Sequence, residues 1–337
     1  SQTGVLTVLG TSSFTTSAGG ADINLSTSAN MFTGTVELNT SGSSGHVTVT
    51  TGATELSLAA SSVGGNLTLT TGHNIIQTGG LVVGGTTTLE APSEVVTLNN
   101  ADNDFQGPIN VVNGFKTQIT DKNAVELGDI ASSRWLYFFA GGAVTQTAAS
   151  AITDGSPTLK IQAQSADGNT DYDITLKNEN NVISNISNWI GKDIEVVSNR
   201  AVQIGYSLWD AITASGYFKL TARGAVTDQG SGTHDIAIAG LTTITAQSAD
   251  GNTDYDITLD LAGHDFSTIS VTGANVELVD ENAIVLGAST VSGTYSVTAT
   301  SENITDSGAL TITGTSTFVT SANNATITLD QGGHAFT

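Results

Sequence analysis

Apolar and polar positions alternate along short stretches of the chain. Leu67 and Leu69 flank one polar residue, and so do Val276 and Leu278. A period of two residues is typical of a β-strand that turns one face toward a core. Gly, Asn, Asp and Ser interrupt these stretches at short intervals, and few segments show the period of a helix. The pattern therefore predicts an all-β protein made of many short strands.

The apolar stretches recur at a nearly constant interval. Two columns of equivalent residues mark the repeat, and the spacings in the first column are 75, 72, 83 and 74 residues. The first column consists of Phe14, Leu89, Ile161, Ile244 and Phe318, and the second of Phe32, Phe105, Ile183, Phe266 and Phe336. We therefore expect four imperfect units of about 75 residues. They span about 4–79, 80–150, 151–232 and 233–308, with a partial unit at 309–337.

A single coil of short strands cannot bury its apolar face alone, whereas stacked coils share one continuous core. At about 20 residues per coil, the whole chain, 1–337, is expected to form one continuous parallel β-helix of about 16 coils. The repeat pattern diverges between Arg134 and Lys219, so we expect insertion loops in the middle of this solenoid.

A polar column accompanies the apolar ones. It contains Asn30, Asn103 and Asn181, and His264 and His334 occupy the same position in later units. Amide side chains in such a column can bond backbone groups of adjacent coils. The two histidines lie a full unit apart, which favours a structural role for them over metal binding.

Composition narrows the functional classes. The chain has 31 acidic against 9 basic residues, a net charge of −22, and no cysteine. We expect no nucleic-acid partner, because an acidic chain without a basic cluster repels phosphates. We also expect no membrane insertion in this segment, because it has no run of about 18 or more apolar residues. Stability must come from stacking and not from disulfides.

One segment resembles a known family of repeats. The sequence GANVELVDENAIVLGASTVSGTYSVTATSENITDSG at Gly273–Gly308 is similar to the haemagglutinin-type repeats of large bacterial adhesins related to filamentous haemagglutinin. The resemblance extends over nearly the whole chain and is strongest in 81–128 and 240–337. It implies a right-handed β-helix, secreted by a two-partner or autotransporter route to the cell surface and used as a stalk, fibre or binding surface.

The same resemblance implies the partners of the chain. They are adjacent repeats of the same protein, parallel copies in a fibre, and a glycan or the surface of a host or neighbouring cell. We also expect the chain to be an excerpt of a longer protein, because it begins at Ser1 inside the repeat pattern and ends at Thr337 within a unit.

Aromatic residues mark the first candidate site. The internal alignment places Trp135, Tyr137, Phe139 and Tyr217 at positions that carry Thr or Ser in other units, so their side chains are expected to face outward. An exposed aromatic stripe favours an interface with a glycan or another fibre. The alternative is that an insertion loop, Asn188–Lys192 or Ser207–Gly216, folds over the stripe and makes a secondary core.

Two acidic loops mark the second candidate site. They place oxygen-bearing side chains at alternate positions, which is a pattern that calcium uses. The residues are Asp167, Asn169, Asp171 and Asp173 in one loop, and Asp250, Asn252, Asp254 and Asp256 in the other. The alternative is a solvated turn that needs no ion, since Asp and Asn favour turns by themselves. Calcium is thus a candidate ligand, and no other cofactor is indicated.

Two functions from different classes fit this pattern. The first is a structural and adhesive repeat segment without catalytic activity, which the regular Ser- and Thr-rich repeats favour. The second is a β-helical carbohydrate-active enzyme, either a polysaccharide lyase or a glycosidase. Glycosidases need two carboxyl groups about 5–9 Å apart. Asp193, Glu195 and Asp210 lie in the divergent region, but no motif assigns them such a role. We therefore expect no enzyme.

Overall fold

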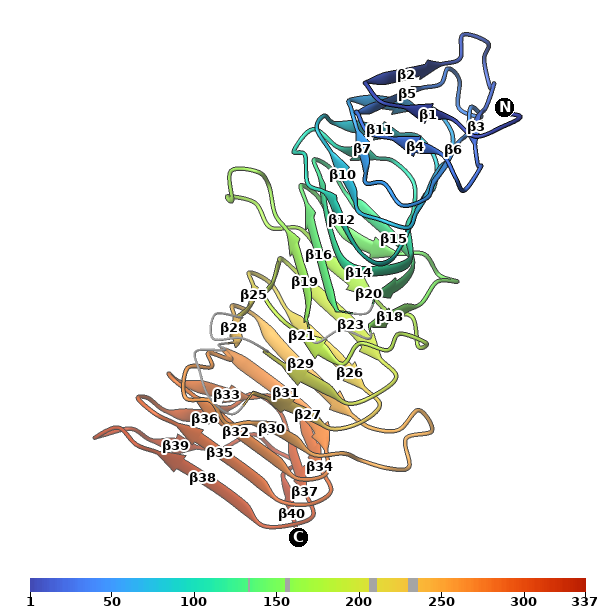
Figure 1. The fold of residues 1–337 in the computed structure, drawn as a ribbon. Coiled ribbons are helices and arrows are strands. Elements are labelled where there is room, and N and C mark those ends of the chain that lie inside the picture. Colours follow the sequence, from blue (N-terminus) through green and yellow to red (C-terminus); the bar gives the residue numbers. More distant parts are fainter. Residues whose placement is uncertain (133, 155–157, 206–210, 230–235) are drawn as a thin grey trace. The chain divides into compact units, whose positions relative to one another are not determined.

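The computed structural model describes residues 1–132, 134–154, 158–205, 211–229 and 236–337. Within these ranges every regular element is a β-strand, and the strands pair in parallel. The chain winds in successive coils, and each strand pairs with the equivalent strand of the next coil (Figure 1). The fold is a parallel β-solenoid of about 15 turns, which confirms the predicted fold class.

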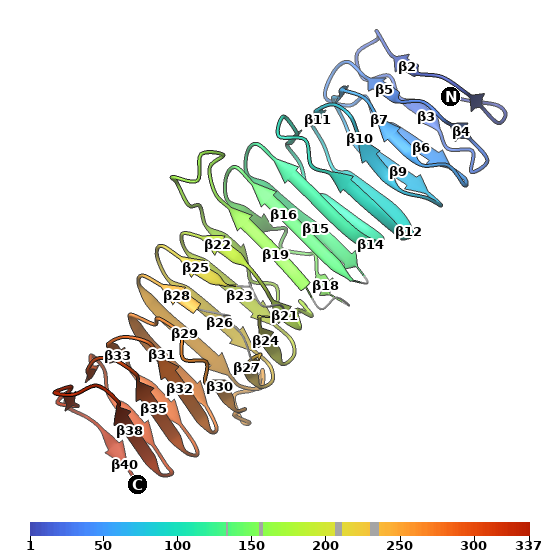
Figure 2. The same cartoon turned by 60° about the vertical axis from the view of Figure 1, so that its left-hand side comes forward.

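The chain divides into two compact units. The first comprises Ser1–Pro157 and Ile161–Thr170, and the second comprises Thr158–Lys160 and Asp171–Thr337. Figure 2 shows the parallel strands of each unit lying side by side as successive rungs. Each unit is described below by itself.

The described part of the first unit contains eighteen complete strands. They are β1 (Thr7–Val8), β2 (Ser12–Thr15), β3 (Ile23–Leu25), β4 (Met31–Phe32), β5 (Val36–Asn39), β6 (Val47–Thr51), β7 (Leu56–Leu58), β8 (Ser61–Val63), β9 (Leu67–Thr71), β10 (Ile75–Gln77), β11 (Leu81–Val83), β12 (Thr87–Leu98), β13 (Asp104–Phe105), β14 (Ile109–Asp121), β15 (Val125–Ser132), β16 (Trp135–Ala140), β17 (Val144–Gln146) and β18 (Ile152–Asp154). Strand β19 (Thr158–Ala163) contributes residues to both units.

The second unit continues the same pattern. Its strands are β20 (Ile174–Leu176), β21 (Asn185–Ile186), β22 (Trp189–Gly191), β23 (Ile194–Ser198), β24 (Val202–Ile204), β25 (Ile212–Ala214), β26 (Phe218–Ala222), β27 (Val226–Asp228), β28 (Ile236–Ile238), β29 (Leu241–Ala246), β30 (Ile257–Leu259), β31 (Thr268–Gly273), β32 (Val276–Asp280), β33 (Ile284–Leu286), β34 (Ser289–Val291), β35 (Tyr295–Ala299), β36 (Ile304–Asp306), β37 (Leu310–Ile312), β38 (Ser316–Thr320), β39 (Ile327–Thr328) and β40 (Ala335–Phe336).

The core consists of apolar columns that run from coil to coil. In the first unit Val49 pairs with Leu69 and Leu69 with Leu89, and all three side chains are fully buried. In the second unit Leu278 pairs with Val297, which is also fully buried. Leu67, Leu136, Phe218 and Tyr295, which occupy equivalent positions of successive repeats, are all buried. The in-register stacking keeps each apolar face turned inward, because a slip by one residue would turn it to solvent.

Polar ladders hold the coils together where strands begin. Asp22 Oδ1 accepts a hydrogen bond from the backbone N–H of His46 at 2.8 Å, and His46 Nδ1 accepts one from Asn66 at 2.9 Å. Asn66 Oδ1 continues the ladder by accepting one from Thr86 at 3.0 Å. Each side chain thus satisfies a backbone donor of the next coil, which would otherwise lack a partner at the corner.

The column of asparagines bonds backbone groups in the way the sequence predicted. Asn103 Oδ1 accepts a hydrogen bond from the backbone N–H of Leu81 at 2.9 Å. Its Nδ2 donates to the carbonyls of Leu98 and Thr120 at 3.1 and 3.0 Å. Asn30 makes the equivalent contacts one sequence repeat earlier, also in the first unit. The column is therefore a structural brace between coils.

One predicted insertion loop is wrong. The segment Asn188–Lys192 contains β22, which pairs with β25 as part of the stack. Trp189 is fully buried, and its Nε1–H donates to the carbonyl of Leu159 at 2.8 Å. A buried indole needs such a partner for its N–H. In the other candidate loop, Ser207–Gly216, residues 207–210 lie outside the described part of the chain, and residues 212–214 form β25.

Candidate binding surface

A row of aromatic side chains lies on the outer face of β16 in the first unit. Trp135, Tyr137 and Phe139 are partly exposed, whereas the alternating residues Leu136 and Phe138 are fully buried. The orientation follows directly from the two-residue period of a strand. Because the apolar alternate residues fill the core, the three aromatic rings must lie on the outside.

The neighbouring strand β14 adds a fourth ring. Lys116 of β14 pairs with Trp135, and Gln118 pairs with Tyr137. Phe115, which precedes Lys116, lies edge-on to Trp135 with ring centroids 5.8 Å apart. We refer to Phe115, Trp135, Tyr137 and Phe139 as the aromatic cluster. Phe115 was not among the residues predicted for the aromatic stripe. It directly precedes Lys116, the residue that pairs with Trp135.

Two cationic side chains lie over these rings. The Arg134 guanidinium carbon is 4.6 Å from the Trp135 ring centroid and 5.4 Å from that of Phe115. Lys116 Nζ is 5.6 Å from the centroid of Tyr137. All three distances are within the range of a cation–π attraction, which contributes about 0.5–1 kcal/mol at exposed sites. The surface is thus aromatic and basic in a chain that is otherwise strongly acidic.

A surface pocket adjoins Phe139 at one end of the row. It has a volume of about 300 Å³ and is lined by residues of the first unit, among them Thr120, Lys122, Phe139, Gln162 and Gln164. The lining combines one aromatic ring with amide, hydroxyl and ammonium groups. This mixture of an apolar platform and polar hydrogen-bonding groups is typical of sites that hold small polar ligands.

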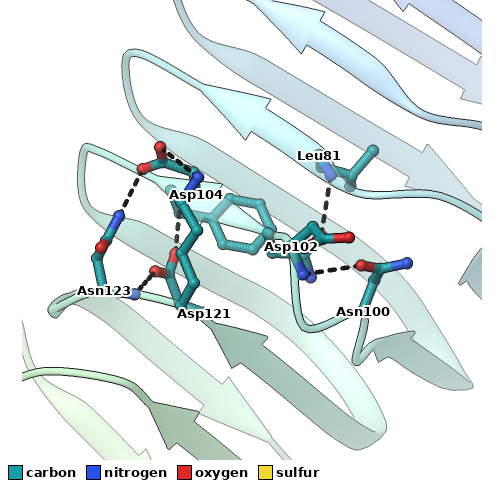
Figure 3. Close-up of polar contacts among 9 residues, drawn as sticks. Leu81, Asn100, Asp102, Asp104, Asp121 and Asn123 are labelled. Carbon is teal, nitrogen blue, oxygen red and sulfur yellow. Dashed lines mark hydrogen bonds and ion pairs between the residues drawn. The ribbon is translucent and has the colours of Figure 1, made fainter. Parts of the chain in front are cut away.

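Asp121 also lines this pocket, with a carboxylate that is almost fully buried. Its Oδ2 accepts a hydrogen bond from the backbone N–H of Phe105 and its Oδ1 accepts one from Asn123, both at 2.6 Å (Figure 3). Burial raises the pKa of Asp121 despite these hydrogen bonds. Asp104 lies beside it and pairs with Lys122 at 3.2 Å. Partial burial opposes ionisation of Asp104, but hydrogen bonds from Lys122 and Gln106 lower its pKa overall.

Two carboxyl groups with opposite pKa shifts are a pattern found in acid–base catalysis. Asp121, one member of this pair, has a counterpart in the second unit. Asp280 accepts hydrogen bonds from the backbone N–H groups of Phe266 and Asn282, both at 2.8 Å, which repeats the contacts of Asp121. Ser198, also in the second unit, takes the same place one sequence repeat earlier, where its Oγ accepts from the backbone N–H of Ile183 at 3.1 Å. Either Asp or Ser can thus accept the backbone hydrogen bond at this turn.

Tyr217, the fourth residue of the predicted stripe, lies in the second unit. Its side chain is 40 % exposed, and its backbone N–H donates to Asp193 Oδ1 at 3.0 Å. The structure therefore brings together Trp135, Tyr137 and Phe139 within one unit, and Tyr217 is not part of the aromatic cluster.

The first acidic loop is a self-contained turn. Asp167 Oδ1 accepts hydrogen bonds from Ser165 Oγ at 2.6 Å and from the backbone N–H of Asn169 at 3.1 Å. Asn169 Nδ2 donates to the other carboxylate oxygen of Asp167 at 2.9 Å. These hydrogen bonds, led by that from Ser165, lower the pKa of Asp167 to about 2. Asp171 and Asp173 of the same predicted site belong to the second unit.

The second acidic loop lies entirely in the second unit. Ser248 and Asn252 hold Asp250 as their counterparts hold Asp167, and its pKa is likewise about 2. Asp254 Oδ1 accepts instead from Gln247 at 2.8 Å. Asp256 Oδ1 accepts from the backbone N–H and Nδ2 of Asn275, each at 3.0 Å. The three carboxylates thus bind three different sets of protein donors.

Among the described residues, no group of three or more acidic or histidine side chains is placed to hold a metal ion. Calcium binding by either loop stays a prediction, and the turn formed by hydrogen bonds accounts for the geometry seen.

The carboxylates proposed for an enzyme also have structural partners. Glu195 lies between Lys177 at 3.2 Å and Lys219 at 2.8 Å, and the hydrogen bond from Lys219 is the main cause of its lowered pKa. Asp193 continues the corner ladder by accepting from Tyr217. Asp210 lies outside the described residues.

The fold and its surface define the chain as a β-solenoid repeat protein. Its sequence belongs to the DUF5649 family, described as repeats of unknown function, whose model matches residues 1–39, 44–112, 114–188, 191–272 and 273–337. No curated protein and no solved structure matches the chain. No helix in the described part of the chain is long and apolar enough to cross a membrane.

Proposed function

We propose that this chain is a structural and adhesive repeat segment of a large secreted bacterial surface or filament protein. In this proposal the stacked coils serve as a stalk, and the aromatic cluster of the first unit is a surface that binds glycan. The resemblance of Gly273–Gly308 to haemagglutinin-type repeats supports a location at the cell surface, and the absence of cysteine fits a chain that is exported unfolded. Adjacent repeats or parallel copies in a fibre are the expected protein partners.

The observation that carries the adhesive part is the outward aromatic row on β16. Outward positions of other coils, such as Thr68, Thr70, Ser296 and Thr298, carry small hydroxyl residues. Leaving three large rings at such positions costs solubility without adding to the main core. Contiguous exposed aromatic residues usually mark an interface, and their flat faces suit the C–H faces of sugar rings.

No observation favours the alternative of a carbohydrate-active enzyme. The hydrogen bond that Asp121 accepts recurs at Asp280 in the second unit, and Glu195 is held between two lysines. The enzyme alternative therefore stays a prediction without structural support.

The test is retention of the chain on immobilised polysaccharides, using cellulose, xylan, dextran, alginate and polygalacturonate as the panel. We expect at least one polysaccharide to retain the native chain. The triple substitution Trp135→Thr, Tyr137→Thr and Phe139→Thr should abolish that retention. A matched control replaces the outward residues Ser296 and Thr298 by Ala and should bind as the native chain does.

The folding of each variant is checked by thermal unfolding. The aromatic substitutions remove surface rings and should lower the free energy of unfolding by no more than about 2 kcal/mol, including the loss of the Phe115–Trp135 contact. A native chain that no polysaccharide retains, or a triple variant that is retained equally well, contradicts the adhesive function.

A further inference from the structure

Two positive charges stand at the aromatic cluster of a chain with very few of them. The sequence has 9 basic residues against 31 acidic ones. Lys116 and Arg134 lie directly over the rings of Tyr137 and Trp135. In a chain this acidic, most cations are expected to find a carboxylate partner nearby, because opposite charges attract at short range.

Most of the other cations do have such a partner. Ion pairs within the described residues involve Lys122, Lys177, Lys192, Lys219 and Arg223. Across those same described ranges, no ion pair involves Lys116 or Arg134. The contacts of these two side chains are instead with aromatic rings, so their charge is available to an anion from outside the chain.

The geometry of Arg134 favours a carboxylate as that anion. A guanidinium group that stacks on aromatic faces uses its flat face and leaves the N–H groups along its edge for hydrogen bonds. A carboxylate matches this edge with two parallel N–H···O bonds, which makes the pair strong and specific in direction. Lys116, beside Tyr137, supplies a second charge on the same surface. The outward side chain of Gln118, opposite Tyr137 in the strand pairing, adds an amide that can bond hydroxyl groups.

We propose that the aromatic cluster binds an acidic polysaccharide built of uronic acid residues. Sugar rings lie against the parts of the aromatic cluster that Arg134 and Lys116 leave uncovered, while the carboxylates of the polymer pair with these two cations. This inference rests on the proposed adhesive function and adds the chemical class of the glycan. A uronate polymer offers both features at once, because each residue combines a sugar ring with a carboxylate. A neutral glycan uses the rings alone and leaves both cations without a partner.

The experiment measures affinity for two soluble probes, polygalacturonate oligosaccharides and uncharged cello-oligosaccharides of similar length. We expect the native chain to bind the acidic probe at least tenfold more tightly than the neutral one. The double substitution Lys116→Gln and Arg134→Gln should reduce affinity for the acidic probe at least tenfold. Added salt should weaken binding of the acidic probe in the native chain and have little effect in the double variant, since exposed charges are screened by salt.

The matched control is Lys177→Gln with Lys219→Gln. It removes the same amount of positive charge from the second unit, where both lysines flank Glu195. It should leave affinity for polygalacturonate within twofold of the native value. An equal loss in the control would show that net charge alone governs binding and would overturn the proposed contacts.

Other outcomes separate this inference from the proposed function. Equal or tighter binding of the neutral probe, lost in the triple aromatic variant, overturns the uronate class but supports a glycan-binding surface. Tighter binding of dextran sulfate than of polygalacturonate overturns the choice of a carboxylate. If neither probe nor any polysaccharide of the panel binds, the adhesive function itself fails.

Discussion

His264 Nε2 lies 3.0 Å from Asp228 Oδ2 in the core of the second unit, where the two side chains are 0 % and 2 % exposed. His264 Nδ1 accepts a hydrogen bond from the backbone N–H of Ile236 at 3.1 Å, so the proton is assigned to Nε2, which donates to Asp228. Asp306 and His334 repeat the pairing at 2.7 Å.

The first unit builds the same brace from amides. Gln77 Nε2 donates to Asn103 Oδ1 at 2.8 Å, and Asn103 Nδ2 donates back to Gln77 Oε1 at 3.0 Å. Gln2 and Asn30 form a second such pair. The partners change together from unit to unit, either Gln with Asn or Asp with His. The chain therefore uses two kinds of side-chain pair, Gln with Asn and Asp with His, to join a strand end to the next turn through a hydrogen bond.

This exchange predicts a double-mutant cycle. His264→Asn alone removes the side-chain donor of Asp228 and leaves it the backbone N–H of Leu261. Asp228→Gln alone removes the carboxylate that accepts from the His264 N–H. Each single change should lower the free energy of unfolding by about 1–3 kcal/mol, the usual cost of a buried group without a partner. The double variant copies Gln77–Asn103 and should recover at least half of the summed loss, as measured by thermal or urea unfolding. Additive losses in the double variant would show that the two side chains are not coupled.

Asp280 predicts a pH dependence of stability. Burial raises its pKa from 3.8 to about 6, so the folded state takes up a proton more readily than the unfolded state. The stability that this carboxyl group contributes is complete below pH 4 and is lost as the pH rises through 6. The difference at neutral pH is at most about 3 kcal/mol. The melting temperature of the native chain should therefore fall between pH 5 and pH 7.

Ser198 supplies the variant for this test, because serine already occupies the equivalent position. Asp280→Ser should flatten the dependence of melting temperature on pH in this range. The control Glu277→Ser removes an exposed carboxylate from the same strand β32 and should keep the native slope. Equal slopes in Asp280→Ser and the native chain would mean that Asp280 does not titrate near pH 6.

The fold could be predicted because the repeat makes each column visible several times. Leu67 and Tyr295 are assigned to the core by their equivalents in other units, and both are buried. Trp135 is assigned to the outside by the same alignment. That alignment does not say which residue lies beside Trp135, because the pairing of Lys116 with Trp135 depends on the length of the intervening loop. The cationic part of the surface was for this reason not predicted.

Trp189 is a buried residue that the repeat alignment did not assign to the core. It lies where the repeat pattern diverges, and it was assigned to an insertion loop for lack of equivalents. It is buried in β22 of the stack, and its indole N–H donates to the carbonyl of Leu159, thirty positions earlier in the chain. A contact over this distance is not visible in the local sequence pattern. The buried carboxylates are easier to recognise from the sequence, because Asp121 and Asp280 are both the first residue of the recurring pattern D-x-N-A-x-x-L-G.

The hydrogen bonds within the acidic turns predict that calcium does not change the melting temperature of the chain. Asp250 is held by Ser248 and Asn252, and Asp256 is held by Asn275, so neither needs an ion to complete its contacts. The melting temperature should be the same within error in 5 mM EDTA and in 5 mM calcium chloride. A ligand that binds only the folded chain must raise stability. A higher melting temperature in calcium, lost in Asp250→Asn but kept in Asp260→Asn, would restore the calcium hypothesis.

A close approach between the backbones of two coils gives a sharp test of the stacking. A Cβ atom on Gly64 would lie 2.0 Å from the backbone oxygen of Gly42, whereas one on Gly10 would meet nothing within 4 Å. Gly64→Ala must therefore push two coils apart and should lower the free energy of unfolding by about 1–3 kcal/mol, as overpacked sites do. Gly10→Ala is the matched control and should stay within about 0.5 kcal/mol of the native value. If urea unfolding finds the two variants equally stable, the coils of the first unit are not stacked as closely as the parallel pairing requires.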